Sequence, residues 1–288
     1  MIWFLLSLGA AFFLATNSAY VKRFFPDVSP WDLALIPIIY AMPFCVVTLL
    51  FIDIPPIGPG FVPTLAWVLP LIMAAIVLHF RAIHVSPLSL TLPFLSFTPV
   101  FVLFTGDLIL NEQINSNGIT GILLVVAGGY IINLDAVRNG FLGPLKAIWH
   151  EPGSVMMLIV AALYGLTSVG GKVIILESSP LFAGTVLLCV YGIFLTLILV
   201  VTSKASLKAI LRKPLLGFGA GLILFLELIC HNLTISMVTA AYMITIKRMA
   251  GIFSVLYGWL LFREQGIRYR LLGTAIMTAG AVVIGLFG

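Results

Sequence analysis

The sequence predicts an all-α integral membrane protein. Of its 288 residues, 61% are hydrophobic and only 9% are charged, and the mean hydropathy is +1.20. Soluble proteins carry about 25% charged residues, so lipid rather than water is the solvent for most of this chain. In lipid, every backbone polar group needs a partner within the protein, and continuous apolar runs of this length satisfy that need as helices rather than as barrel strands.

Ten apolar segments are long enough to cross a hydrocarbon core of ~30 Å as helices. They cover residues 2–21, 32–52, 64–83, 87–110, 117–134, 153–175, 181–202, 214–236, 238–262 and 269–287. The first segment has no basic leader before its apolar run, which favours a retained span over a cleaved signal. We therefore expect ten transmembrane helices in a multi-pass protein of the cell membrane, either an inner or a plasma membrane.

The chain repeats itself after a shift of 152 residues, without gaps. The shift aligns the pairs His79 and His231, Gly106 and Gly258, Glu112 and Glu264, Gly121 and Gly273, and Gly128 and Gly280. We expect a first repeat over 1–134, a surface linker over 135–152 and a second repeat over 153–288. Each half has five segments, an odd number, so the two halves insert with opposite orientation. Inverted repeats of this kind are typical of secondary transporters, whose substrate site lies near the midplane.

The basic residues of the loops all fall on one side of a ten-span arrangement. They are Lys22, Arg23, Arg138, Lys146, Lys204, Lys208, Arg212, Lys213, Arg263, Arg268 and Arg270. The positive-inside rule then places both termini outside the cytoplasm. These loops account for the net charge of +5 through contact with anionic lipid headgroups, and we expect no nucleic-acid partner.

Two adjacent cations, Lys247 and Arg248, lie near the middle of the ninth segment. A charge at the centre of a membrane helix costs about 2.5–3.5 kcal/mol on insertion scales, so it normally faces water, a partner charge or a ligand. Glu227 lies about as far before the turn at 237–238 as Lys247 lies after it, which puts both near the midplane. His231 shares a helix face with Glu227, and His79 is its repeat counterpart.

Two interpretations of this polar centre are open. Glu227 can pair with a cation and merely fasten the eighth and ninth spans together. Alternatively, two cations against one carboxylate leave an excess positive charge that binds an anionic substrate, with bidentate contacts from Arg248 and a point charge from Lys247. Likewise, His79 and His231 can couple transport to H+ or can simply hydrogen-bond neighbouring helices.

Three further residues complete the predicted substrate site. Ser254 lies seven residues after Lys247 and so on the same face of a continuous helix. Asn17 and Tyr242 are polar side chains in the first and ninth spans, although such residues more often join helices. We expect no catalytic residue, because no HExxH, GxSxG or P-loop pattern occurs. The three cysteines have no CxxC spacing, and we expect no metal and no cofactor.

Two segments carry a family resemblance. They are SPLSLTLPFLSFTPVFVLFTGDLILNE, followed by TGILLVVAGGYIIN, and the second copy that ends in GWLLFRE, followed by LLGTAIMTAGAVVIG. These segments resemble the EamA-like branch of the drug/metabolite transporter superfamily, and the resemblance spans essentially the whole chain. The dipeptide Lys247-Arg248 is also similar to the Lys-Arg pair with which plastid sugar-phosphate translocators hold a phosphate.

The resemblance implies a secondary transporter of a small molecule that works by alternating access. With the buried Lys-Arg pair, we expect a small polar substrate that is anionic or zwitterionic. The alternatives are a flippase or carrier of a phosphate-bearing lipid, an exporter of cationic drugs or amino acids, and a membrane scaffold that transports nothing. The sequence leaves the coupling ion, the direction of transport and the oligomeric state open.

Overall fold

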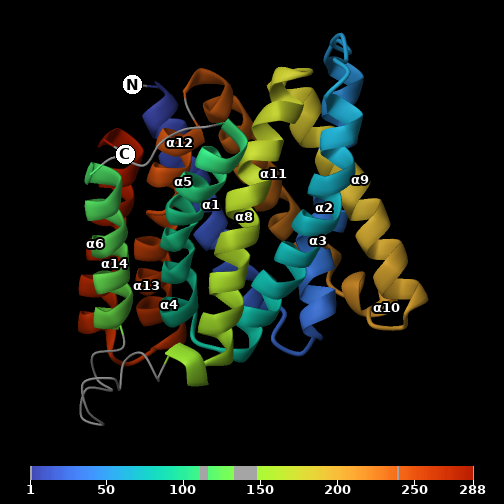
Figure 1. Cartoon of the computed structure of the whole chain (residues 1–288). Coiled ribbons are helices and arrows are strands. Elements are labelled where there is room, and N and C mark those ends of the chain that lie inside the picture. The colour runs from blue at the N-terminus through green and yellow to red at the C-terminus, as the bar shows by residue number, and fades with distance from the viewer. Residues whose placement is uncertain (1, 111–115, 133–147, 239, 288) are drawn as a thin grey trace.

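The protein is a bundle of membrane helices (Figure 1). Its structure, a computed structural model, describes residues 2–110, 116–132, 148–238 and 240–287, and every regular element within these ranges is helical. In chain order the elements are α1 (Ile2–Phe24), α2 (Pro30–Phe51), α3 (Phe61–Val85), α4 (Leu88–Thr91), η1 (Leu92–Phe97), α5 (Thr98–Leu110), α6 (Ser116–Ile132), α8 (Pro152–Leu176), α9 (Pro180–Val201), α10 (Leu207–Ile210), α11 (Pro214–Met237), α12 (Ala240–Lys247), α13 (Ala250–Phe262) and α14 (Ile267–Phe287).

The described residues contain seven segments that are long and apolar enough to cross a membrane. Six are the continuous helices α1, α2, α3, α8, α9 and α11, and the seventh is Met243–Phe262. The expected all-α, multi-pass membrane protein is therefore confirmed. The count of ten spans stays a prediction, because the fourth expected span consists of the short elements α4, η1 and α5.

Proline marks the start of four of the long helices. Pro30, Pro152, Pro180 and Pro214 each occupy the first turn, where a missing N–H costs no intrahelical hydrogen bond. At α2 the Ser29 hydroxyl also accepts a hydrogen bond from the Asp32 N–H at 3.1 Å. These local signals fix where the chain turns back into the membrane.

Helix pairs in the bundle follow the two-repeat architecture. α1 packs along α11, and α3 packs along α8. The shift of 152 residues carries α1 onto α8 and α3 onto α11, so each of these two pairs is the repeat counterpart of the other. Two more pairs, α2 with α9 and α6 with α14, each join a helix to its own counterpart.

The closest of these pairings, α6 with α14, depends on glycine. A Cβ atom on Gly273 would lie 2.6 Å from the Gly128 carbonyl oxygen, and one on Gly280 would lie 2.7 Å from the Gly121 carbonyl oxygen. Small residues let helix backbones approach closely, which is how membrane helices gain packing energy without a hydrophobic driving force. These four glycines are the ones that the repeat aligns.

The fourth and ninth spans are both interrupted at repeat-related positions. The 3₁₀ segment η1 covers 92–97, and the break between α12 and α13 falls at 248–249, within the region that the shift assigns to η1. The sequence predicted a continuous ninth helix, and that prediction is wrong. Irregular backbone at membrane depth is tolerated where it is buried in protein or lines a cavity.

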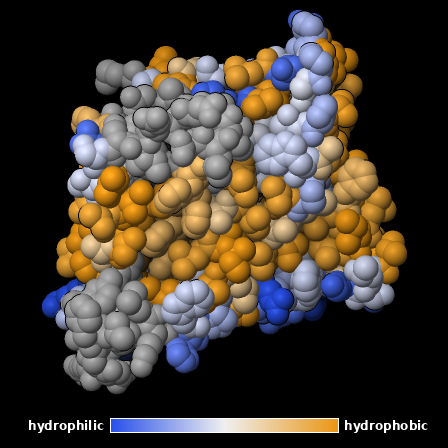
Figure 2. All heavy atoms as spheres, viewed as in Figure 1, coloured by the Kyte–Doolittle hydropathy of each residue, from blue (hydrophilic) through white to orange (hydrophobic). Residues whose placement is uncertain are grey.

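The surface of the bundle carries an apolar band with hydrophilic residues at both ends (Figure 2). The two chain termini lie at one end, and the other end, which we call the basic end, carries the last turn of α1 with Lys22 and Arg23 together with α10 (Figure 1). Most of the expected surface linker, and with it Arg138 and Lys146, lies outside the described residues, as does Glu112.

Replacing Gly273 by alanine should destabilise the protein, because its methyl group meets the backbone of α6. We expect the melting temperature of the purified protein to fall by several degrees, consistent with a loss of about 1–3 kcal/mol. Gly171→Ala is the matched control, since a Cβ atom there meets nothing within 4 Å. Equal melting temperatures for the two variants would contradict the close α6–α14 contact.

Candidate functional site

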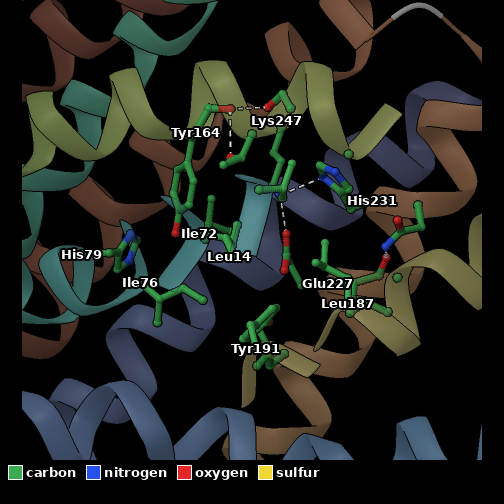
Figure 3. A pocket seen from close by; sticks show the side chains of 18 of the residues that line it. Leu14, Ile72, Ile76, His79, Tyr164, Leu187, Tyr191, Glu227, His231 and Lys247 are labelled. Carbon is green, nitrogen blue, oxygen red and sulfur yellow. Dashed lines mark hydrogen bonds and ion pairs between the residues drawn. The ribbon is translucent and has the colours of Figure 1, made fainter. Parts of the chain in front are cut away.

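A central cavity of about 190 Å³ lies between the two halves of the bundle (Figure 3). Its lining comes from α1, α3, α8, α9, α11 and α12, together with Arg248. The charged residues among this lining are Glu227, Lys247 and Arg248, so the cavity has a formal excess of one positive charge when its histidines are neutral. An excess charge at membrane depth is costly unless a counter-ion accompanies it.

Lys247 is the centre of the charged part of the site. Its ammonium group forms an ion pair with Glu227 and donates a hydrogen bond to Nδ1 of His231 at 3.0 Å (Figure 3). The Lys247 side chain is 11% exposed and that of Glu227 is 13% exposed. The pair is therefore largely shielded from solvent, and its Coulomb attraction is correspondingly strong.

The helical period brings these groups to one place. Glu227 and His231 lie four residues apart on α11, and Leu224, Leu228 and Asn232 on the same side of the helix also line the cavity. Lys247 is the last residue of α12, directly before the break in the ninth span. The antiparallel turn between α11 and α12 places the lysine opposite the glutamate, as the sequence predicted.

Arg248 has a different set of partners from its neighbour. Its Nη1 atom donates to the Leu95 carbonyl and to the Thr98 hydroxyl, both at 3.1 Å, and its Nε atom donates to the Ile244 carbonyl at 3.2 Å. The guanidinium group thus binds backbone oxygens that the break in the fourth span leaves without helical partners. Arg248 lines the cavity but is 4% exposed, and its donors are directed at the protein.

A second, uncharged polar group lies on the side of the cavity formed by α1, α3 and α8. The Nε2 atom of His79 shares a hydrogen bond of 3.0 Å with the Ser18 hydroxyl, whereas its Nδ1 atom has no partner among the described residues. The rings of His79 and Tyr164 are neighbours, with centroids 6.4 Å apart. His79 and its repeat counterpart His231 both line the cavity, but from opposite sides (Figure 3).

Most of the cavity wall is apolar. The residues that form it are Leu14, Ile38, Val68, Ile72, Ile76, Phe80, Ile174, Ile175, Ala183, Leu187, Leu224 and Leu228. Tyr164 and Tyr191 add aromatic rings with polar tips. A site of this composition holds the apolar part of a ligand by burial and orients it with a few polar groups.

The remaining predicted site residues have varied positions. The Asn17 amide lines the cavity and donates to the Ala220 carbonyl at 2.9 Å, which joins α1 to α11. The Ser254 hydroxyl is buried and donates to the Gly251 carbonyl at 2.6 Å, and Ser254 is not part of the cavity lining. The side chain of Tyr242 lies outside the described residues.

Sequence reasoning missed three lining residues with polar groups, namely Ser18, Tyr164 and Tyr191. The two tyrosines had a usable signal, since each places a hydroxyl near the middle of an otherwise apolar span, far from the interfaces where tyrosine is common. Ser18 had none, because serine in a membrane helix most often bonds to its own backbone, and the Ser18 hydroxyl also lies 3.0 Å from the Leu14 carbonyl.

A network of polar contacts lies between the cavity and the basic end. The turn between α3 and α4 is its centre: the Ser86 carbonyl accepts from Lys22 at 2.5 Å, and the Ser86 hydroxyl donates to Glu151. The Glu264 carboxylate accepts from the N–H groups of Leu88 and Ser89 at 2.9 and 3.1 Å. These contacts tie α1, α4, α8 and the α13–α14 loop together beyond the cavity on this side.

Removing one partner of the central ion pair should be strongly destabilising. Glu227→Gln leaves Lys247 as an uncompensated buried charge, and we expect the stability of the folded protein to fall by about 3 kcal/mol or more. The double variant Glu227→Gln with Lys247→Met removes both charges and should recover most of that loss. Thermal denaturation of the two variants checks this, and a double variant no more stable than Glu227→Gln alone would contradict a shielded pair.

Comparison with known proteins agrees with this architecture. The model of the EamA-like transporter family matches residues 1–134 and 151–286, that is, nearly the whole chain in two parts. A solved structure titled only "Crystal structure of protein" has a TM-score of 0.67 and 13% identity, covers 97% of this chain and is itself covered to 95%. That likeness shows the fold alone. No curated protein matches the sequence. The similarity of Lys247-Arg248 to sugar-phosphate translocators stays a prediction. The family match over both halves shows that this chain belongs to the EamA-like transporter family of membrane proteins.

Proposed function

We propose that the protein is a secondary active transporter of a small organic anion or zwitterion, working by alternating access around the central cavity. The observation that carries the proposal is the position of Lys247, a cation largely shielded from solvent at the wall of the cavity. Membership of the transporter family supports a small-molecule substrate and membrane lipids as partners. The repeats over 1–134 and 153–288 are the two units that would move against each other.

The charge of the site supports an anionic group on the substrate. Glu227 neutralises one of the two cations, and the other leaves a field that favours a negative ligand. Arg248 contributes to this field from behind, because its donors are occupied by backbone oxygens and by Thr98. Lys247 is therefore the direct ligand that we propose, with Glu227 and His231 as the residues that position it.

Lys247→Met should abolish transport while leaving the protein folded in the membrane. A thermal-shift screen across carboxylates, phosphorylated metabolites, amino acids and cationic amines first selects the best binder. Uptake of that compound, in labelled form, into proteoliposomes is then expected to fall at least tenfold in the variant. Lys208→Met is the control, since Lys208 is exposed on α10 and does not line the cavity.

The screen also separates the alternatives. Stabilisation by cationic amines alone, with binding that survives Lys247→Met, would refute the anionic assignment and favour a substrate that binds Glu227. Full uptake of an anion by the Lys247→Met variant would remove Lys247 from the site.

We further propose H+ as the coupling ion, because Glu227, Lys247 and His231 form a continuous chain of groups that exchange protons. Uptake into proteoliposomes should then be accelerated several-fold by an imposed pH gradient and should return to its basal rate when a protonophore is added. Stimulation by a sodium gradient without any effect of the pH gradient would refute this coupling.

A further inference from the structure

The cavity has polar groups at two separate places with apolar residues between them. Figure 3 shows Lys247, Glu227 and His231 on one side and His79 with Tyr164 on the other. The side chains drawn between the two groups are Leu14, Ile72 and Ile76. We call the first group the charged pole and the second group, made of His79 and Tyr164, the neutral pole.

The neutral pole has hydrogen-bonding capacity that the protein does not use. The Nδ1 atom of His79 is buried without a partner among the described residues, and the whole side chain is 2% exposed. The Tyr164 hydroxyl forms no hydrogen bond with any other described residue. Figure 3 shows the His79 imidazole directed at the cavity and at Tyr164. A buried polar atom without a partner costs free energy, and a ligand that bonds to it recovers that cost.

The apolar residues between the poles restrict what the ligand can be. A molecule that is polar along its whole length would lose its hydration against Ile72, Ile76 and Leu14 and gain no hydrogen bond there. A molecule with an apolar middle instead buries that middle favourably. A fully polar ligand such as a sugar therefore fits this arrangement poorly.

We propose that the substrate has two polar ends joined by an apolar segment: an anionic group that binds Lys247 and an uncharged hydrogen-bonding group, such as a hydroxyl, that binds at the neutral pole. This inference rests on the proposed function, because it specifies the chemistry of the molecule carried. Tyr164 and His79 then determine specificity, since they distinguish a substrate with the distal hydroxyl from one without it.

The test uses two matched series of probes on the purified full-length protein: unbranched alkanoates of about four to eight carbons and the same acids with a terminal hydroxyl. At the chain length that spans the two poles, the hydroxy acid should bind about three- to tenfold more tightly than the plain acid, the usual gain from one hydrogen bond. Tyr164→Phe should reduce this ratio to about one without changing affinity for the plain acid. Tyr257→Phe is the matched control, because Tyr257 bonds to Thr16 and does not line the cavity.

The outcomes separate this inference from the proposed function. If the hydroxyl adds nothing at any chain length, or if Tyr164→Phe preserves the ratio, the neutral pole is overturned. Binding of the plain acids that is lost in Lys247→Met would then still support an anion site. If neither series binds, or if binding is equal in Lys247→Met and the wild type, the anionic substrate itself is refuted. His79→Leu provides a second variant with the same expected loss of the ratio, should Tyr164→Phe fold poorly.

Discussion

The ion pair between Lys247 and Glu227 is the interaction on which the centre of this protein depends. An ammonium ion in a membrane helix is tolerated only with a counter-charge or water, and Glu227, held on the adjacent α11, supplies the counter-charge. The pair lies at the wall of a cavity rather than in dry packing, so one side of it is left to a ligand. The same residues therefore satisfy the cost of burial and provide the charge that a substrate meets.

The second cation has a role in the architecture that its neighbour does not have. Arg248 lies in the break of the ninth span and donates to the Leu95 carbonyl in the 3₁₀ segment of the fourth span. Each interruption frees backbone oxygens, and a planar guanidinium with several donors can satisfy more than one of them. The two broken spans are thus connected directly at the level of the cavity, which joins the first half of the chain to the second.

Much of the architecture could be predicted from the sequence. Composition determined the membrane class, the gapless shift of 152 residues paired the glycines that meet between α6 and α14, and helical geometry placed Glu227, His231 and Lys247 together. The face assigned to Ser254 was derived from a continuous helix, and the break at 248–249 separates Ser254 from the face of Lys247. Hydropathy could not reveal that break, because the residues around it are as apolar as those of an unbroken span. The position of His79 beside Tyr164 depends on how α3 packs on α8, which no local pattern encodes.

The glycine contact between α6 and α14 bears on how such a chain could arise. Gly128 meets Gly273 and Gly121 meets Gly280, so each glycine faces the counterpart of the other member of its own repeat. This is the geometry of an isologous interface, in which one surface patch is complementary to itself about a two-fold axis. Two identical five-helix proteins inserted in opposite directions would already form this contact as a dimer. Duplication and fusion of one ancestral gene would then preserve the interface unchanged and would require only a connecting segment.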